Sequence, residues 1–415
     1  MVKIVAPESR IQMRKVIDAA PVPDAATPEP GPNPAVAANQ NILAHVGVDR
    51  AFDVGQAIRW AAKARKISVL RLGFDILRRQ INRQKLTAAD YFHFGLHLAK
   101  FTNADRAQFI GNQATTVLNN AMSQPEIVAI WRDKVATAQA LEAAGLPTPP
   151  IRAVFQLTGM LSPYPNLTSV EALTEYLCKG AFLPFFGKPI DGSEGRGAIS
   201  IVARKGLDRV VLGDGRVVEV ARLVQEIADA YPQGYLFQDK LRQHPDVVAL
   251  AGPVMCSLRV FSIWVGGKYT PLYSRLRLPA PGAMIDVTFT STAAIDLTDG
   301  RITRTQDGRR LGGQSLDHSQ VTGAPLIGAQ LPDWPKVMAL SEAAHALFPT
   351  QGVLGIDIAL TEDGPTIVEL NSNPMHGGYH QTCESGLLNP AFCKVFAAAL
   401  AERGITRRGP GMLVP

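Results

Sequence analysis

The segment 352–373, with the sequence GVLGIDIALTEDGPTIVELNSN, constrains the fold of this chain more than any other stretch. Two apolar runs rich in β-branched residues, 353–360 and 366–370, flank the polar group 361–364. This pattern is typical of a β-hairpin, in which two antiparallel strands are joined by a short turn. The segment therefore predicts a paired-strand unit near the carboxyl end of the chain.

Acidic side chains interrupt both predicted strands. If Glu362, Asp363 and Gly364 form the loop, with Gly364 left-handed, Asp357 lies opposite Glu369 and Asn371 lies on the same face. Facing carboxylates repel each other unless a positive group lies between them. Mg²⁺ binds carboxylates, amide oxygens and substrate phosphates, so the hairpin predicts a divalent-cation site. The alternative is that Asp357 is a polar residue at a strand edge and that Glu369 points to solvent.

Composition is that of an ordinary globular protein. The 415 residues are 46% hydrophobic and 19% charged, with a net charge of +6. This charge permits an anionic substrate, and because basic and aromatic residues are not interleaved we expect no nucleic-acid partner. The four cysteines show no CxxC spacing, and we find no signal peptide or membrane-spanning run. A reducing cytoplasm is the expected location.

The amino-terminal part divides into a leader and a helical region. Residues 1–40 are rich in Pro and Ala and should form an extended linker. Residues 41–130 have helical periodicity, with helices expected over 53–65, 67–84 and 88–100. The segment 59–85 holds nine basic residues against one acid, so it could dock on an anionic membrane surface, bind a phosphorylated substrate, or form a solvated helix face.

A helix over 133–144 carries Lys134 and ends at Gly145. Further along, the sequence FFGKPIDGSEGRGAISIV (185–202) reads as a strand, a glycine-rich loop and a second strand. Neither a Rossmann turn nor a P-loop fits, because both of those open a helix. The unit instead predicts a flap that closes over phosphates, with Ser193 as a donor and Lys188 as the point charge. A glycine-rich hairpin turn without a ligand is the alternative.

Two further segments have features of a nucleotide site. A strand is expected over 217–224, with a helix over 224–230, and the sequence YLFQDKLRQHP (235–245) then reads as an interdomain hinge whose backbone could bind adenine. Strands are expected over 252–278 around the turn at Gly266 and Gly267. Within them Arg259, Arg275 and Arg277 interrupt apolar runs, which indicates either recognition of an anion or salt bridges to neighbouring acids.

The order of these parts resembles an ATP-grasp enzyme, and in detail the sugar-transfer-associated group, also described as α-L-glutamate ligase-related proteins. The similarity covers 88–394 and is carried by AADYFHFGLHL, FQDKLRQHP with SLRV, AIDLTDGRI, LPDWPKV and the hairpin ending in ELNSNP. It implies an α+β ATP-grasp fold, in which two α+β subdomains clamp ATP. The implied division is a leader (1–40), a helical region (41–130), two subdomains (131–240 and 241–400) and a tail (401–415).

The resemblance also implies roles for residues. One or two Mg²⁺ ions, or Mn²⁺, would bind Asp357, Glu369 and Asn371. Lys188, Arg259 and Arg277 are the candidate catalytic residues, with Arg259 on the transferring phosphoryl group or acylphosphate. ATP would contact Lys134, Lys188, the flap and the hinge backbone, that is, Gly192, Ser193, Glu194, Gly195, Arg196, Gly197, Gln238, Asp239 and Leu241. Gln238 replaces a Glu found in many hinges of this superfamily, and the helical amino-terminal region replaces a Rossmann-like substrate domain.

The implied activity is an ATP-dependent carboxylate–amine ligase acting through an acylphosphate, with a link to polysaccharide or cell-surface biosynthesis. His376 and His380 are expected either to act on the amine substrate or to lie in a loop at the pocket rim. Two alternatives remain: a phosphotransferase acting on a sugar or alcohol, and a silent MgATP-binding scaffold. The sequence does not specify the acid, the amine or the oligomeric state.

Overall fold

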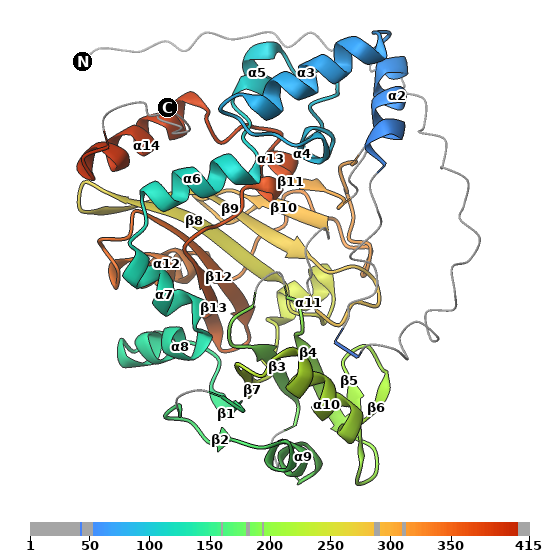
Figure 1. Cartoon of the computed structure of the whole chain (residues 1–415), viewed down its shortest axis with the longest axis vertical. Coiled ribbons are helices and arrows are strands. Elements are labelled where there is room, and N and C mark those ends of the chain that lie inside the picture. Colours follow the sequence, from blue (N-terminus) through green and yellow to red (C-terminus); the bar gives the residue numbers. More distant parts are fainter. Residues whose placement is uncertain are drawn as a thin grey trace.

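The computed structural model describes residues 42–43, 53–158, 161–179, 183–192, 195–285, 291–308 and 313–405. The predicted leader 1–40 and residues 406–415 of the predicted tail lie outside these ranges. Two β-sheets form the centre of the described chain, and helices from the amino-terminal region cover one end of it (Figure 1).

In the described residues, seven helices precede the first strand: α2 (Val54–Ala64), α3 (Val69–Ile81), α4 (Ala88–His93), α5 (Asn103–Ala107), α6 (Asn112–Ala121), α7 (Pro125–Arg132) and α8 (Lys134–Ala143). Side chains cap several of them, as in α2, where Asp53 accepts from the Gln56 N–H, and α8, where Asp133 accepts from the Val135 and Ala136 N–H groups. The helical character predicted for 41–130 is confirmed where that region is described. The helix expected over 88–100 is shorter, because it ends at His93 and Gly95 takes a left-handed conformation.

The first sheet has seven strands in the order β2-β1-β7-β3-β4-β5-β6. Its strands are β1 (Ile151–Phe155), β2 (Asn166–Leu167), β3 (Phe185–Pro189), β4 (Ile199–Arg204), β5 (Arg209–Leu212), β6 (Val217–Glu219) and β7 (Tyr235–Asp239). Two helices, α9 (Val170–Lys179) and α10 (Val220–Ala230), pack their apolar side chains on one face. The expected strand over 217–224 is wrong beyond Glu219, because Val220, Leu223 and Val224 are buried at helical spacing in α10.

The second sheet is antiparallel, with the order β11-β10-β9-β8-β12-β13. Its strands are β8 (Ser257–Val265), β9 (Lys268–Leu278), β10 (Ser291–Ile295), β11 (Ile302–Gln306), β12 (Val353–Thr361) and β13 (Gly364–Asn371). The expected turn between β8 and β9 is confirmed, since Gly266 and Gly267 both have positive φ. The remaining helices are α11 (Pro245–Ala251), α12 (Trp334–Ala346), α13 (Gly377–Cys383) and α14 (Pro390–Glu402).

The two faces of the second sheet differ in character. Residues such as Ile356 and Ile358 alternate toward an apolar core that includes side chains of α11 and α12. On the opposite face, Phe261 and Tyr273 pack with α6, α13 and α14 in a second apolar cluster. The rest of that face carries charged side chains, and helix α8 lies between the two sheets with residues in both neighbouring cores. This arrangement places Lys134, at the start of α8, between the sheets.

Candidate active site

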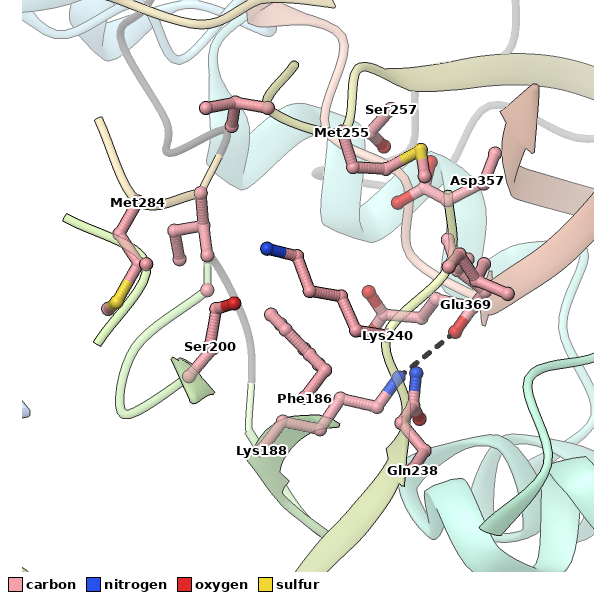
Figure 2. A pocket seen from close by; sticks show the side chains of 18 of the residues that line it. Phe186, Lys188, Ser200, Gln238, Lys240, Met255, Ser257, Met284, Asp357 and Glu369 are labelled. Atoms are coloured by element: carbon pink, nitrogen blue, oxygen red, sulfur yellow. Dashed lines mark hydrogen bonds between the residues drawn. The ribbon is translucent and has the colours of Figure 1, made fainter. Parts of the chain in front are cut away.

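A cavity of about 260 Å³ lies between the two sheets. Its walls include Phe186 and Lys188 from the first sheet and Asp357 and Glu369 from the second. Figure 2 shows the two acidic side chains on one side of the cavity, Ser200 and Met284 on the other, and Lys240 reaching between them. The cavity therefore gathers predicted phosphate and metal residues from segments that are far apart in sequence.

The predicted pairing of Asp357 with Glu369 is confirmed, although its expected cause is wrong. The turn has two residues, Glu362 and Asp363, because Thr361 pairs directly with Gly364, whose φ is +112°. A register shift between Asp357 and Ile358 then advances β13 by one residue. This bulge restores the pairing that a three-residue loop would have given.

Arg259 is the cation that compensates Asp357. Its Nε and Nη2 donate to the Asp357 Oδ1 and Oδ2 at 2.6 and 2.5 Å, and both side chains are buried. Burial opposes both charges, yet each partner stabilises the charge of the other, so the pKa of Asp357 lies below its ordinary value and that of Arg259 above. Asp357 is therefore a buried, ionised carboxylate inside the sheet.

Glu369 lies beside Asp357 on the neighbouring strand and lines the same cavity. Lys134 Nζ is 3.6 Å from its Oε1, and the Glu369 side chain is 29% exposed, so the carboxylate is accessible from the cavity. Asn371 Nδ2 lies 3.4 Å from Asp357 Oδ2. Exchanging the amide O and N, which are assigned from the hydrogen-bond network, would turn the Asn371 oxygen toward Asp357. These three side chains therefore offer the hard oxygen donors that suit Mg²⁺.

Two lysines line the cavity beside these acids. Lys134 Nζ donates to the Gly192 carbonyl at 2.5 Å, and Lys188 Nζ donates to the Val368 carbonyl at 3.2 Å. Burial lowers the pKa of Lys188 to about 8, and the nearby Glu369 opposes that shift. An ammonium in this position has a strong preference for an anionic partner.

The predicted strand–loop–strand order is confirmed in the described residues, and the closing of the loop over phosphates stays a prediction. Antiparallel β3 and β4 flank the loop, and Gly192, Gly195 and Arg196 line the cavity. Gly197 has a φ of +72°, and a Cβ there would lie 2.2 Å from the Tyr231 hydroxyl oxygen. Only glycine fits that position. The predicted contacts Ser193 and Glu194 lie outside the described residues.

The predicted hinge follows β7. Gln238, Asp239 and Leu241 all line the cavity. The Asp239 carboxylate binds Arg152 at 2.6 and 2.5 Å, and its N–H donates to the Pro150 carbonyl. Lys240 and Leu241 come directly after the strand and lie outside the pairing of the sheet. The backbone groups of Lys240 and Leu241 are therefore the first after β7 that are not used in pairing the strands, and both residues line the cavity.

Sequence reasoning missed Lys240 and the apolar wall of the cavity. That wall includes Phe186, Met255, Met284 and Ile285. Phe186 shares a strand face with Lys188 and could have been found from this two-residue spacing. Lys240 is likewise two residues from Gln238, a predicted contact of ATP. The methionines carry no comparable signal, because their segments join the cavity only through the tertiary fold.

Arg275 and Arg277 lie on one face of β9. Arg275 is directly opposite Arg259, and Arg277 lines the cavity. Arg275 is only 8% exposed, its Nε has no hydrogen-bond partner, and a Cβ on Gly378 would lie 2.4 Å from its Nη1. Burial, followed by the neighbouring charges of Arg277 and Arg259, lowers the pKa of Arg275 to about 9. Within the described chain, Arg275 has neither a hydrogen bond nor an ion pair.

Both expectations for His376 and His380 are wrong. Each side chain is fully buried, and neither lines the cavity. His376 Nδ1 shares a hydrogen bond with the Tyr273 hydroxyl, and His380 Nδ1 lies 3.0 Å from the Ser385 carbonyl. Burial lowers the pKa of both rings below the ordinary value, so they belong to the neutral core beneath α13.

Several solved structures share a limited likeness with this chain. An N5-carboxyaminoimidazole ribonucleotide synthetase in its ADP complex is 13% identical, with a TM-score of 0.38 over 65% of this chain and 53% of its own. An L-amino acid ligase from Bacillus licheniformis is 14% identical (TM-score 0.35; 61% and 43%), and a D-alanine–D-alanine ligase from Bacillus anthracis is 13% identical (TM-score 0.36; 66% and 69%). The chain thus spans about half the length of the first two.

No curated protein matches the chain in sequence. The model of one family, described as sugar-transfer associated ATP-grasp, matches residues 113–392, which is more than half of the chain. This match includes the flap, the hinge and the acidic hairpin, and with it the predicted ATP-grasp fold is confirmed. The chain belongs to the sugar-transfer associated ATP-grasp family.

Proposed function

We propose that this protein is an ATP-dependent carboxylate–amine ligase that works through an acylphosphate. The observation that carries the proposal is the convergence of Lys134 and Lys188 with Asp357 and Glu369 on one cavity. Such a set of charges suits a nucleoside triphosphate with its divalent cation better than a neutral ligand. The apolar wall around Phe186 and the backbone at Leu241 suit a flat purine base at the other end of the same cavity.

The residues that line the cavity can be assigned to different parts of a bound ATP. Lys134, Lys188 and the flap would hold the phosphates, and Lys240 would add a third positive charge. Asp357, Glu369 and Asn371 would hold one or two Mg²⁺ ions, which when bound supply charge neutralisation at the β- and γ-phosphates. Arg259 acts here mainly through Asp357, because the bidentate pair occupies its Nε and Nη2. It is therefore a positioning residue in this proposal.

Arg275 and Arg277 are the proposed contacts for the acid substrate. Arg275 is nine-tenths buried and its Nε has no hydrogen-bond partner among the described residues, so a bound anion would offset part of the cost of burying this charge. Arg277 lines the cavity together with Asp357, and Arg275, which is not among the lining residues, lies on the same face of β9 opposite Arg259. A substrate carboxylate placed there lies beside the γ-phosphate and is held for in-line attack.

The proposed reaction has two balanced steps. A carboxylate oxygen attacks the γ-phosphorus, the bond from that phosphorus to the β-bridging oxygen breaks, and ADP leaves with the electron pair. The amine nitrogen then attacks the acyl carbon, the carbon–oxygen bond to phosphate breaks, and phosphate leaves as the amine loses a proton. No histidine is among the described residues lining the cavity, so the departing phosphate or water takes that proton.

A phosphotransferase would use the same ATP site but would transfer the phosphoryl group to a hydroxyl. Arg275, whose buried Nε has no hydrogen-bond partner in the described chain, favours an anionic first substrate over a neutral alcohol, and so favours the ligase. A silent scaffold would bind MgATP without any turnover. Because the family description refers to sugar transfer, sugar acids and amino sugars are the first compounds to test.

Isotope transfer distinguishes these functions. The purified chain is incubated with MgATP and pools of ¹⁸O-labelled carboxylic acids and amines, and the released phosphate is analysed by mass spectrometry. A ligase moves one ¹⁸O atom from the acid into inorganic phosphate and forms an amide. Phosphate that stays on a hydroxyl acceptor would identify a phosphotransferase. MgATP binding with no ADP formed from any pool would identify a scaffold.

A further inference from the structure

Helix α3 lies at the outer edge of the molecule (Figure 1), and exposed apolar side chains form a ridge along it. Leu70, Phe74, Leu77 and Ile81 are 85%, 69%, 51% and 68% exposed. Their spacing of four, three and four residues places all four on one face of the helix. We call these four side chains the α3 ridge. Most of the other large exposed apolar side chains in the described chain are scattered singly, which is ordinary for a protein surface.

The opposite face of α3 holds the helix to the protein. Leu72 and Ile76 are buried in the core of the amino-terminal helices, together with side chains of α2 and α4. Arg79 is also buried, where it donates to Asp75 and Gln84. Because packing fixes this inner face, the ridge is held outward and cannot turn into the core without unfolding the helix.

The charges around the ridge are positive. Arg71 and Arg78 are exposed on α3 beside the ridge, and Lys63, Lys66 and Arg83 are exposed just before and after the helix. The one acid of the helix, Asp75, is held by Arg79 and by the Tyr91 hydroxyl. An apolar face bordered by unopposed arginines is the pattern of helices that lie in the interface of anionic bilayers.

We propose that α3 docks this protein on an anionic lipid surface, with the α3 ridge in the acyl boundary and Arg71 and Arg78 on lipid headgroups. Charge argues against a second copy of the chain as the occupant. An antiparallel pair of α3 helices centred on Phe74 would bring Arg71 of one copy close to Arg78 of the other, and these like charges repel. Anionic headgroups complement the same arginines. The docking uses none of the residues of the ATP cavity.

Vesicle co-sedimentation of the full chain tests the proposal. We expect binding to vesicles of phosphatidylcholine containing phosphatidylglycerol, and little binding to phosphatidylcholine alone. Phe74→Gln together with Leu77→Gln should strongly weaken binding, since polar amides then replace the two central side chains of the α3 ridge. Arg71→Gln with Arg78→Gln should weaken it about 30-fold, because each basic residue near an anionic surface contributes about 1 kcal/mol.

Leu207→Gln is the matched control, because Leu207 is 90% exposed outside α3. Its binding should equal that of the wild type, and all variants should keep the far-ultraviolet circular dichroism of the wild type. Absence of wild-type binding to anionic vesicles overturns the proposal. A dimer that Phe74→Gln dissociates would assign the ridge to a second copy, and a photo-crosslink from position 77 to residues 1–41 would assign it to the chain itself. Equal loss in the Leu207 variant would also refute docking through α3.

Discussion

Arg259 on β8 and Asp357 on β12 are directly paired across the second sheet, and the guanidinium donates two hydrogen bonds to the carboxylate. The pair fixes the Asp357 side chain inside the wall of the cavity, next to Glu369 on the other neighbouring strand. Two facing carboxylates in the hairpin require a positive group nearby, and Arg259 supplies part of that charge. A divalent cation would share the carboxylate with it.

Removing Arg259 alone should destabilise the protein. In Arg259→Met the buried Asp357 loses its partner, so we expect the free energy of unfolding to fall by about 3–5 kcal/mol without Mg²⁺. Arg259→Met combined with Asp357→Leu should regain much of that loss, because no unpaired charge remains buried. Denaturant unfolding at neutral pH measures both. If the double variant is as unstable as the single one, the shape of Arg259 matters more than its charge.

Glu369→Gln should remove most of the Mg²⁺-dependent affinity for ATP. The substitution keeps the shape of the side chain but removes one carboxylate from the proposed donor set, and hard cations bind neutral amides less well. Calorimetric titration of ATP with and without Mg²⁺ should give an affinity at least about tenfold lower in the variant. Glu362→Gln, in the turn of the same hairpin, is the control and should bind as the wild type does. Unchanged Mg²⁺ dependence in Glu369→Gln would refute the metal assignment.

The pKa of Lys188 predicts how ATP affinity depends on pH. Its pKa is lowered to about 8 in the free protein, so above that pH a growing fraction of the side chain is neutral. Bound phosphates favour the charged form, and ATP affinity should therefore fall as pH rises through 8. The loss should be about tenfold from pH 7 to pH 9. Lys188→Met should bind ATP more weakly at neutral pH and should lack this decline.

Adenosine provides the control for Lys188, because it has no phosphates. Its affinity should be nearly equal in the wild type and in Lys188→Met, and should not change over the same pH range. If the variant loses adenosine and ATP binding equally, Lys188 supports the fold of the pocket instead of contacting phosphate.

The predictions from sequence succeeded for features that are encoded within one short segment of the chain. The hairpin, the flap and the helix before β1 each combine periodicity with turn residues inside one segment, and the structure has all three. The bulge that sets the pairing of Asp357 with Glu369 was not predictable, since a strand of apolar residues does not reveal where its register shifts. The partner of Arg259 and the burial of His376 depend on strands and helices distant in sequence. Short spacing patterns do not encode such contacts.

Arg275 should stabilise substrate binding at the expense of the free protein. Arg275→Met removes a buried charge that has no partner in the described chain, so we expect the free energy of unfolding to rise by about 1–3 kcal/mol. The same variant should raise the KM for the acid about 10–100-fold, because a charge-assisted hydrogen bond contributes about 1.5–3 kcal/mol, while its affinity for MgATP changes little. Denaturant unfolding and ADP release at varied acid concentration measure the two effects. Arg209→Met, an exposed arginine on β5, is the control and should change neither. An Arg275→Met variant that is less stable than the wild type would show that the guanidinium holds α13 to the sheet, and would remove the reason to place the acid there.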